Sequence, residues 1–174
     1  MYRPNTLSIS VAALLLLGEF SVGESSAQQS TKTLRERLVG TWLVTAADNV
    51  GPDGSRFQAF GPNPKGIMMF DANGWFSVQL GQSGRPKFAS DNRLQGTAEE
   101  NKTTVEGSLS YYGNYYIDEE VRVLHLYIES SSWPNLDGIE NKRIITSLSD
   151  DELKWHSPAG YIGTTDDVVW KRAK

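Results

Sequence analysis

The sequence contains no cysteine and only two histidines among its 174 residues. The lack of cysteine excludes disulfide scaffolds, thiolate metal sites, cysteine nucleophiles and lipidated cysteines. Neither histidine stands at a metal-ligand spacing from a second strong ligand. The nucleophile elbow, the Walker phosphate loop and the glycine-rich dinucleotide turn are also missing from the sequence. The sequence therefore predicts no metal and no cofactor, and a fold held together by packing.

An excess of positive charge is lacking as well. Lysine and arginine number 17 against 21 aspartates and glutamates, for a formal net charge of -4. This balance gives no electrostatic reason to expect nucleic acid or an anionic membrane as a partner. The length suits one domain with a substantial core, and nothing in the sequence indicates an oligomeric state.

No apolar run approaches the roughly 20 residues of a membrane-spanning helix. The first thirty residues instead have the parts of an export signal: Arg3, the apolar run Val11–Leu17 and the small residues Ser25–Ala27. A membrane anchor is the alternative, but the run is short and Glu19 interrupts it. We predict a signal peptide over residues 1–27, a polar linker over 28–36 and a folded domain over 37–174. The mature protein is then expected in the periplasm or outside the cell.

Short β-rich segments separated by glycine, proline, asparagine and aspartate turns predict an antiparallel all-β domain. The expected hairpin turn is Asp71–Gly74, and helices are expected at Leu34–Leu38 and Thr97–Tyr111, the latter opened by a capping box. The candidate strands are Gly40–Ala46, Arg56–Phe60, Gly66–Phe70, Trp75–Leu80, Tyr112–Ile117, Val121–Ser130, Ile139–Leu148, Leu153–His156 and Asp167–Lys171. These are enough strands to close a barrel.

Several of these segments resemble a known family. Gly40-Thr41-Trp42 at the start of the first strand is similar to the G-x-W signature of lipocalins. Together with Phe60–Gly66, Gly84–Ser90, Trp133–Asn135 and Val168–Arg172, it resembles bacterial and fungal lipocalin-like domain proteins over about residues 37–172. The resemblance implies an up-and-down β-barrel of about eight to ten strands with a central cavity.

The resemblance also implies a structural role for Trp42. In lipocalins this indole closes one end of the barrel, with a basic side chain of a late strand over its face. Arg172 or Lys171 is expected to supply that cation. Trp170 alternates with Lys171 along the last strand, and we expect Trp170 to point into the core.

The candidate binding site lies on the strands Val121–Ser130 and Ile139–Leu148. If a simple loop joins them, Tyr127 faces Arg143 and Glu129 faces Asn141. This register predicts an inward-facing polar cluster of His125, Tyr127, Glu129 and Arg143 in which Glu129 and Arg143 form a buried ion pair.

The opposite assignment remains open. An apolar set occupies the alternate positions of the same two strands, and such a set normally faces a core: Leu124, Leu126, Ile128 and Ile144. A register slip of one residue reverses the faces. The predicted helix Thr97–Tyr111 reconciles the two patterns if it covers an outer apolar patch. Arg85, in a Gly-flanked loop, is a further candidate at the barrel mouth.

The leading functional hypothesis is an exported protein that binds a small, mostly apolar molecule in the barrel cavity. One alternative is a cyclase- or isomerase-type enzyme in which Tyr127, Glu129 and Arg143 guide protons around a hydrophobic substrate. Another is a filled barrel that acts through its surface. The cavity distinguishes them, because a filled barrel excludes the first two.

Overall fold

A computed structural model describes residues 32–174 of the chain. The predicted export signal, residues 1–27, lies outside the described residues, as does the beginning of the predicted linker. Within residues 32–174, no helix is both long and apolar enough to cross a membrane.

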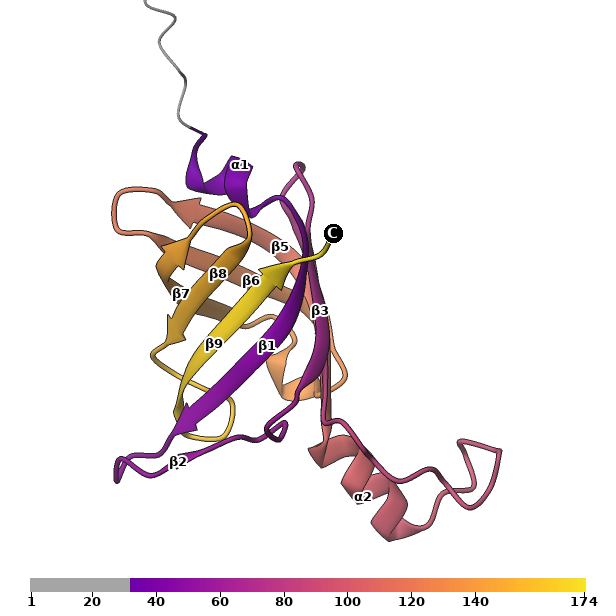
Figure 1. Cartoon of the computed structure of the whole chain (residues 1–174). Helices are drawn as coiled ribbons and strands as arrows, with labels where there is room; N and C mark the ends of the chain where they lie inside the picture. Colours follow the sequence, from indigo (N-terminus) through magenta and orange to yellow (C-terminus); the bar gives the residue numbers. More distant parts are fainter. Residues whose placement is uncertain (1–31) are drawn as a thin grey trace, which may run out of the picture. The chain divides into compact units, whose positions relative to one another are not determined.

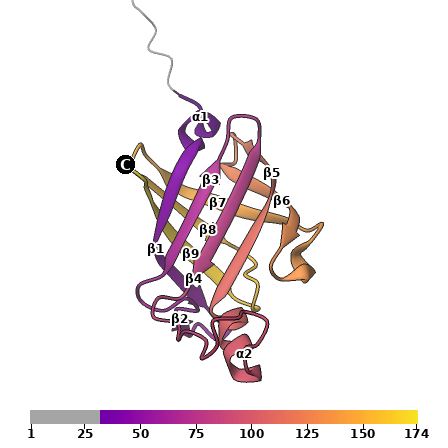
Figure 2. The ribbon, with the colours of Figure 1, turned by 90° about the vertical axis from the view of Figure 1, so that its right-hand side faces the viewer.

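The described chain folds into nine antiparallel strands, arranged as a closed eight-stranded barrel with one short extra strand (Figures 1 and 2). Strand β1 pairs with β3, each strand from β3 to β8 pairs with the next, and β1 also pairs with β9, which closes the barrel. The extra strand β2 pairs with the end of β1. The strands are β1 (Gly40–Val50), β2 (Arg56–Phe57), β3 (Lys65–Phe70), β4 (Trp75–Gly81), β5 (Ser108–Asp118), β6 (Val123–Ser131), β7 (Glu140–Leu148), β8 (Glu152–Ser157) and β9 (Thr165–Arg172). The predicted up-and-down barrel is confirmed.

The tight turn between β3 and β4 is the predicted hairpin. Asp71 closes it through two contacts: its backbone N–H donates to the Trp75 carbonyl at 2.9 Å, and its side chain accepts from the Trp75 N–H at 2.8 Å. Gly74 has a φ of +96°, which a residue with a side chain rarely adopts. The turn thereby fixes the register of β3 against β4.

The two α-helices both begin with a capping box. Thr33 and Glu36 cap α1 (Leu34–Leu38), while Thr97 and Glu100 cap α2 (Ala98–Glu106). A short 3₁₀ helix, η1 (Pro134–Leu136), lies between β6 and β7. Helix α2 is shorter than predicted, because the alternation of buried and exposed residues from Ser108 onward forms strand β5.

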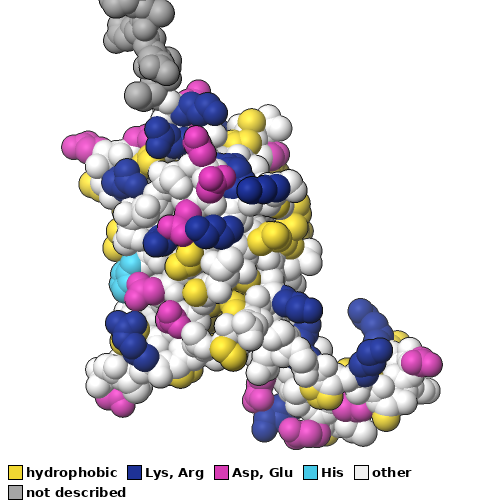
Figure 3. Space-filling view, in the orientation of Figure 1, with side chains coloured by type: hydrophobic (Ala, Val, Ile, Leu, Met, Phe, Trp, Pro, Cys, Tyr) yellow, Lys and Arg dark blue, Asp and Glu magenta, His cyan; other side chains and the backbone are white. Residues whose placement is uncertain are grey.

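Helix α2 has no buried residue and projects with its preceding loop from the lower end of the barrel (Figures 1 and 3). The expectation that this helix covers an apolar patch on the barrel wall is therefore wrong. The physical reason is that the apolar residues of β6 face the inside of the barrel, where Leu124, Leu126 and Ile128 are fully buried.

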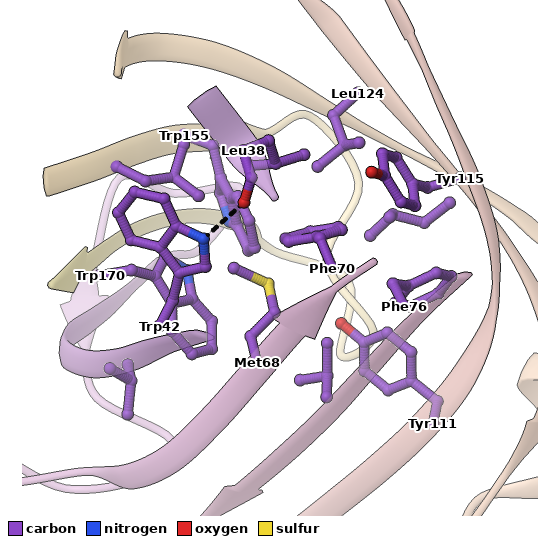
Figure 4. Packing of buried hydrophobic residues seen from close by; sticks show 14 of the residues in the cluster. Leu38, Trp42, Met68, Phe70, Phe76, Tyr111, Tyr115, Leu124, Trp155 and Trp170 are labelled. Atoms are coloured by element: carbon purple, nitrogen blue, oxygen red, sulfur yellow. Dashed lines mark hydrogen bonds between the residues drawn. The ribbon is translucent and has the colours of Figure 1, made fainter. Parts of the chain in front are cut away.

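One end of the barrel is closed by Trp42, which is fully buried (Figure 4). Its Nε1 donates a hydrogen bond to the carbonyl of Leu38 at 2.8 Å, so α1 is tied to the first strand. The guanidinium carbon of Arg172 lies 4.1 Å from the centre of the Trp42 rings, while its nitrogens donate to the carbonyls of Arg37, Val39 and Asp150. The predicted plug is confirmed, with Arg172 as its cation.

Candidate functional site

The pairing of β6 with β7 differs from the predicted register. Tyr127 lies opposite Glu140, not Arg143, which is an offset of three residues. Because side chains alternate along a strand, an odd offset changes which residues of the two strands share a face. Arg143 therefore lies opposite Leu124 and points inward with the apolar residues of β6.

The connection between the two strands explains the offset. Ser130 and Ser131 at the end of β6 pair with β5, and β7 begins to pair with β6 only at Tyr127. The intervening segment contains η1, whose Leu136 is buried. A simple loop was assumed in the prediction, whereas the chain forms a wider connection anchored by an apolar side chain.

The predicted inward cluster is consequently wrong for three of its four members. Tyr127 and Glu129 are exposed on the outer face of β6, and His125 lies on that face too. The predicted Glu129–Arg143 ion pair does not form, because the two side chains lie on opposite sides of the barrel wall. Only Arg143 points into the barrel, where it is 3% exposed.

His125 belongs to a polar cluster on the outside of the barrel. Its Nδ1 lies 2.5 Å from Glu140 Oε1 and 2.9 Å from the hydroxyl of Tyr116, and its ring stacks on the Tyr116 ring at 4.2 Å. The hydrogen bond with His125 holds the pKa of Glu140 below its usual range. These contacts join β5, β6 and β7. They give His125 a structural role that requires no ligand.

Arg85 is exposed in the loop that follows β4. Its side chain lies against Gly81 and Gly107, so close to Gly107 that an added Cβ there would come within 2.9 Å of Arg85 Cδ. Gly107 directly precedes Ser108, a cavity-lining residue. Arg85 is thus near the cavity without being part of its lining, and its role at the mouth stays a prediction.

The barrel contains a cavity of about 480 Å³. Inward-facing residues of β1, β4, β5, β7, β8 and β9 form its wall, and residues of α2 and of the loops at the lower end of the barrel complete it. Five of its lining residues are also exposed to solvent: Val105, Glu106, Ser132, Trp133 and Ile162. These exposed residues place the mouth at the end of the barrel opposite Trp42.

The cavity lining changes from polar to apolar with depth. Along β9, Asp166, Val168 and Trp170 all line the cavity, and the next inward step is Arg172 at the closed end. Asp166 pairs with Asn49 of β1 and with Ser157 of β8 at the same level of the barrel. The deeper wall contains the indoles of Trp155 and Trp170, whose ring centres are 5.4 Å apart. An apolar pocket therefore lies beneath a polar level.

Arg143 is the cation of this polar level. Its Nη2 donates to the hydroxyl of Tyr161 at 2.6 Å, and its Nη1 donates to the Lys142 carbonyl at 3.0 Å. Asn141 Nδ2 donates to the same Tyr161 hydroxyl at 3.3 Å. Burial raises the pKa of Tyr161 well above its ordinary value, so this phenol stays neutral. The hydrogen-bond acceptors of the Arg143 guanidinium are therefore neutral oxygens.

Aromatic rings surround the Tyr161 side chain. The Tyr111 ring lies 6.0 Å away and the Trp133 ring 6.5 Å away, both edge to face. Tyr161 comes from the loop between β8 and β9, Tyr111 from β5, and Trp133 from the segment before η1. Three separate parts of the chain therefore meet at the cavity through these rings.

Asp166 is the carboxylate of the polar level. Its Oδ1 accepts hydrogen bonds from Asn49 Nδ2 at 2.6 Å and from the Thr164 hydroxyl at 3.0 Å. Burial raises the pKa of Asp166 above its usual range, although the hydrogen bonds and the Arg143 charge oppose that effect. Asp166 and Tyr161 were not among the predicted site residues. A possible signal for Tyr161 was the pair of apolar residues between Gly160 and Gly163 in a predicted loop, which indicates a loop that folds back onto the domain.

The match to a family model identifies the family of the chain. Residues 39–173 match the family described as lipocalin-like domain, and the chain belongs to this family. Two solved proteins from Bacteroides uniformis ATCC 8492 are similar: a lipocalin-like protein at 15% identity, covering 79% of this chain and 99% of that chain with a TM-score of 0.42, and a second protein at 17% identity, covering 82% and 96% with a TM-score of 0.42.

A redesigned β-barrel, mFAP1, bound to DFHBI, is also similar to this chain. It is 20% identical, with 81% of this chain and 100% of that chain covered and a TM-score of 0.43. No curated protein matches the sequence at a significant level. The predicted family is confirmed.

Proposed function

We propose that this protein binds a small, mostly apolar molecule in the barrel cavity. The observation that supports it is the cavity of about 480 Å³ with aromatic and aliphatic walls and a few buried polar groups at one level. Sites for small molecules typically have volumes of roughly 300–1,000 Å³ and this type of lining. A filled barrel acting only through its surface would leave no such space.

The structure does not contain the arrangement of residues that the enzymatic alternative required. That alternative required Tyr127, Glu129 and Arg143 around one substrate, but Tyr127 and Glu129 lie on the outer face of the wall. Binding without chemistry therefore accounts for the cavity with fewer assumptions.

We also propose that binding occurs outside the cytoplasm. This location depends on the predicted signal peptide. N-terminal sequencing of the protein from its native host checks this part. We expect the mature chain to begin at Gln28. A protein that keeps residues before Phe20 contradicts export by this signal.

A cavity-filling substitution tests the proposed binding. Val168 lines the cavity, and the adjacent Val169 lies on the opposite face of β9. We expect Val168→Trp to abolish binding of the neutral apolar probe N-phenyl-1-naphthylamine, measured by its fluorescence, because the indole occupies the binding space. The matched variant Val169→Trp should bind the probe as the parent does. Equal binding by both variants, or no binding by the parent, contradicts the proposal.

A further inference from the structure

Arg143 is a buried cation inside the cavity that has no ion-pair partner among residues 32–174. Its hydrogen bonds go to the Lys142 carbonyl and the Tyr161 hydroxyl, both neutral oxygens. Burying an arginine without a counter-ion is costly, since the guanidinium keeps its charge in proteins. The site therefore has a positive charge that an anionic group of a ligand can balance.

The charge of Asp166 acts on Arg143, but no carboxylate of residues 32–174 forms an ion pair with this guanidinium. Arg143 is the one basic residue among the described lining residues, and the acidic ones are Glu106 and Asp166. Glu106 is exposed on α2 at the mouth. The Oδ1 of Asp166 accepts hydrogen bonds from Asn49 and Thr164, and burial raises the pKa of this carboxyl while the Arg143 charge lowers it. A single guanidinium without an ion pair in the cavity suits a ligand with a single negative charge.

The position of Arg143 in the cavity defines the shape of that ligand. Its bond to Tyr161 places the guanidinium at the loop between β8 and β9, on the side of the mouth. The deeper wall, which includes Val168, Trp155 and Trp170, is aliphatic and aromatic, and the two indole Nε1 atoms have no hydrogen-bond partner within residues 32–174. A molecule that fills this space needs a charged group near the mouth and an apolar body that extends toward the closed end.

We propose that the ligand is an amphiphile with one carboxylate, bound by the Arg143 guanidinium, and an apolar body packed against Trp155 and Trp170. The planar guanidinium matches the two oxygens of a carboxylate in a bidentate arrangement. Tyr161 holds the guanidinium in place as a positioning residue. This inference rests on the proposed function and adds the chemical class of the ligand to it.

Competition with a matched pair of ligands tests the inference. Decanoate and 1-decanol have chains of equal length and differ in charge at the head group. Each is used below its solubility limit to displace N-phenyl-1-naphthylamine from the parent chain. We expect decanoate to bind at least about tenfold more tightly than 1-decanol, as a charge-assisted hydrogen bond implies. Arg143→Met should remove this preference while 1-decanol still binds, and Arg143→Lys should keep part of it.

The outcomes separate this inference from the proposed function. If decanoate and 1-decanol displace the probe equally well from the parent chain, the carboxylate assignment is overturned and the apolar binding function stands. If the probe itself does not bind, both fail. The comparison on the parent chain decides the question even if Arg143→Met does not fold. A preference for decanoate that persists in a folded Arg143→Met protein also overturns the role of Arg143.

Discussion

Arg143 and Tyr161, which both line the cavity, are joined by a hydrogen bond of 2.6 Å, with the guanidinium carbon 5.5 Å from the centre of the phenol ring. The first residue lies on wall strand β7 and the second in the loop between β8 and β9. A buried charge in the barrel therefore holds the loop that carries Ile162, one of the exposed residues at the mouth. The Arg143–Tyr161 hydrogen bond therefore connects the cavity wall to the loop at the mouth.

Removing the Tyr161 hydroxyl should destabilise the fold. Tyr161→Phe takes an acceptor away from a buried guanidinium, and a lost hydrogen bond to a charged group typically costs about 1.5–3 kcal/mol. Urea unfolding followed by tryptophan fluorescence measures the loss. The matched variant Tyr127→Phe removes a hydroxyl from an exposed side chain on the outer face and should leave the midpoint unchanged. Equal midpoints for all three proteins would mean that the Arg143–Tyr161 bond contributes nothing.

Trp42 should be essential for the closed end of the barrel. Trp42→Ala removes a fully buried indole together with its bond to Leu38 and its contact with Arg172. Such a change typically costs ~3–5 kcal/mol, a large fraction of the stability of an ordinary domain. Trp75→Ala is the control, because Trp75 is 45% exposed. We expect a much smaller loss there, and the role of Trp42 is refuted if its variant unfolds at the same urea concentration as the parent.

Gly113 should not tolerate even one added carbon. A Cβ at this position would lie 1.9 Å from the carbonyl oxygen of Tyr127, at the irregular step where β5 pairs with β6. Gly113→Ala therefore forces the two strands apart, and overpacking of this kind costs about 1–3 kcal/mol or more. Denaturant midpoints of Gly113→Ala and of the neighbouring Asn114→Ala measure the effect. An alanine at position 113 that is as stable as the parent contradicts the close approach of the strands.

Asp166 should give stability a specific pH dependence. Its folded-state pKa is raised by burial, so the folded protein holds this proton more tightly than the unfolded chain. That contribution is complete below the unfolded-state pKa of about 3.9 and is lost as the pH rises through the folded-state pKa. The nearby charges are Arg143, which favours the carboxylate, and Asp167, which opposes it.

Asp166→Asn should remove this contribution. The difference in unfolding free energy between parent and variant is expected to change across that pH window, with the parent gaining relative stability toward acid. Urea unfolding at several pH values measures it. A difference that is constant with pH excludes a perturbed Asp166.

Local sequence patterns predicted the barrel well but could not predict the register of β6 and β7. Alternating apolar residues locate each strand, and Asp71–Gly74 identifies its hairpin, since both signals lie within a few residues. The register instead depends on η1 and the buried Leu136, which lengthen the connection between β6 and β7. The periodicity of apolar residues does not predict this short helix. The apolar residues Leu124, Leu126 and Ile128 carried the correct information about the inward face.

The cavity residues were hard to predict for a related reason. Arg143 was expected inside the barrel, but with Glu129 as its partner. Its actual partner is Tyr161, 18 residues further along the chain and in a loop. The last strand was predicted to begin at Asp167, whereas Asp166 already lies within β9 and faces Asn49. Both contacts arise only when the barrel closes, so spacing along the chain does not reveal them.

Binding inside the cavity can be tested most directly with the five tryptophans of the chain. Three of them line the cavity, Trp133, Trp155 and Trp170, while Trp42 and Trp75 do not. The measurement is a ¹H–¹⁵N spectrum of the indole N–H groups during titration with N-phenyl-1-naphthylamine. We expect saturable shifts of the three cavity signals with little change at the other two. Shifts confined to the exposed Trp75, or no shift at saturating probe, would contradict this expectation.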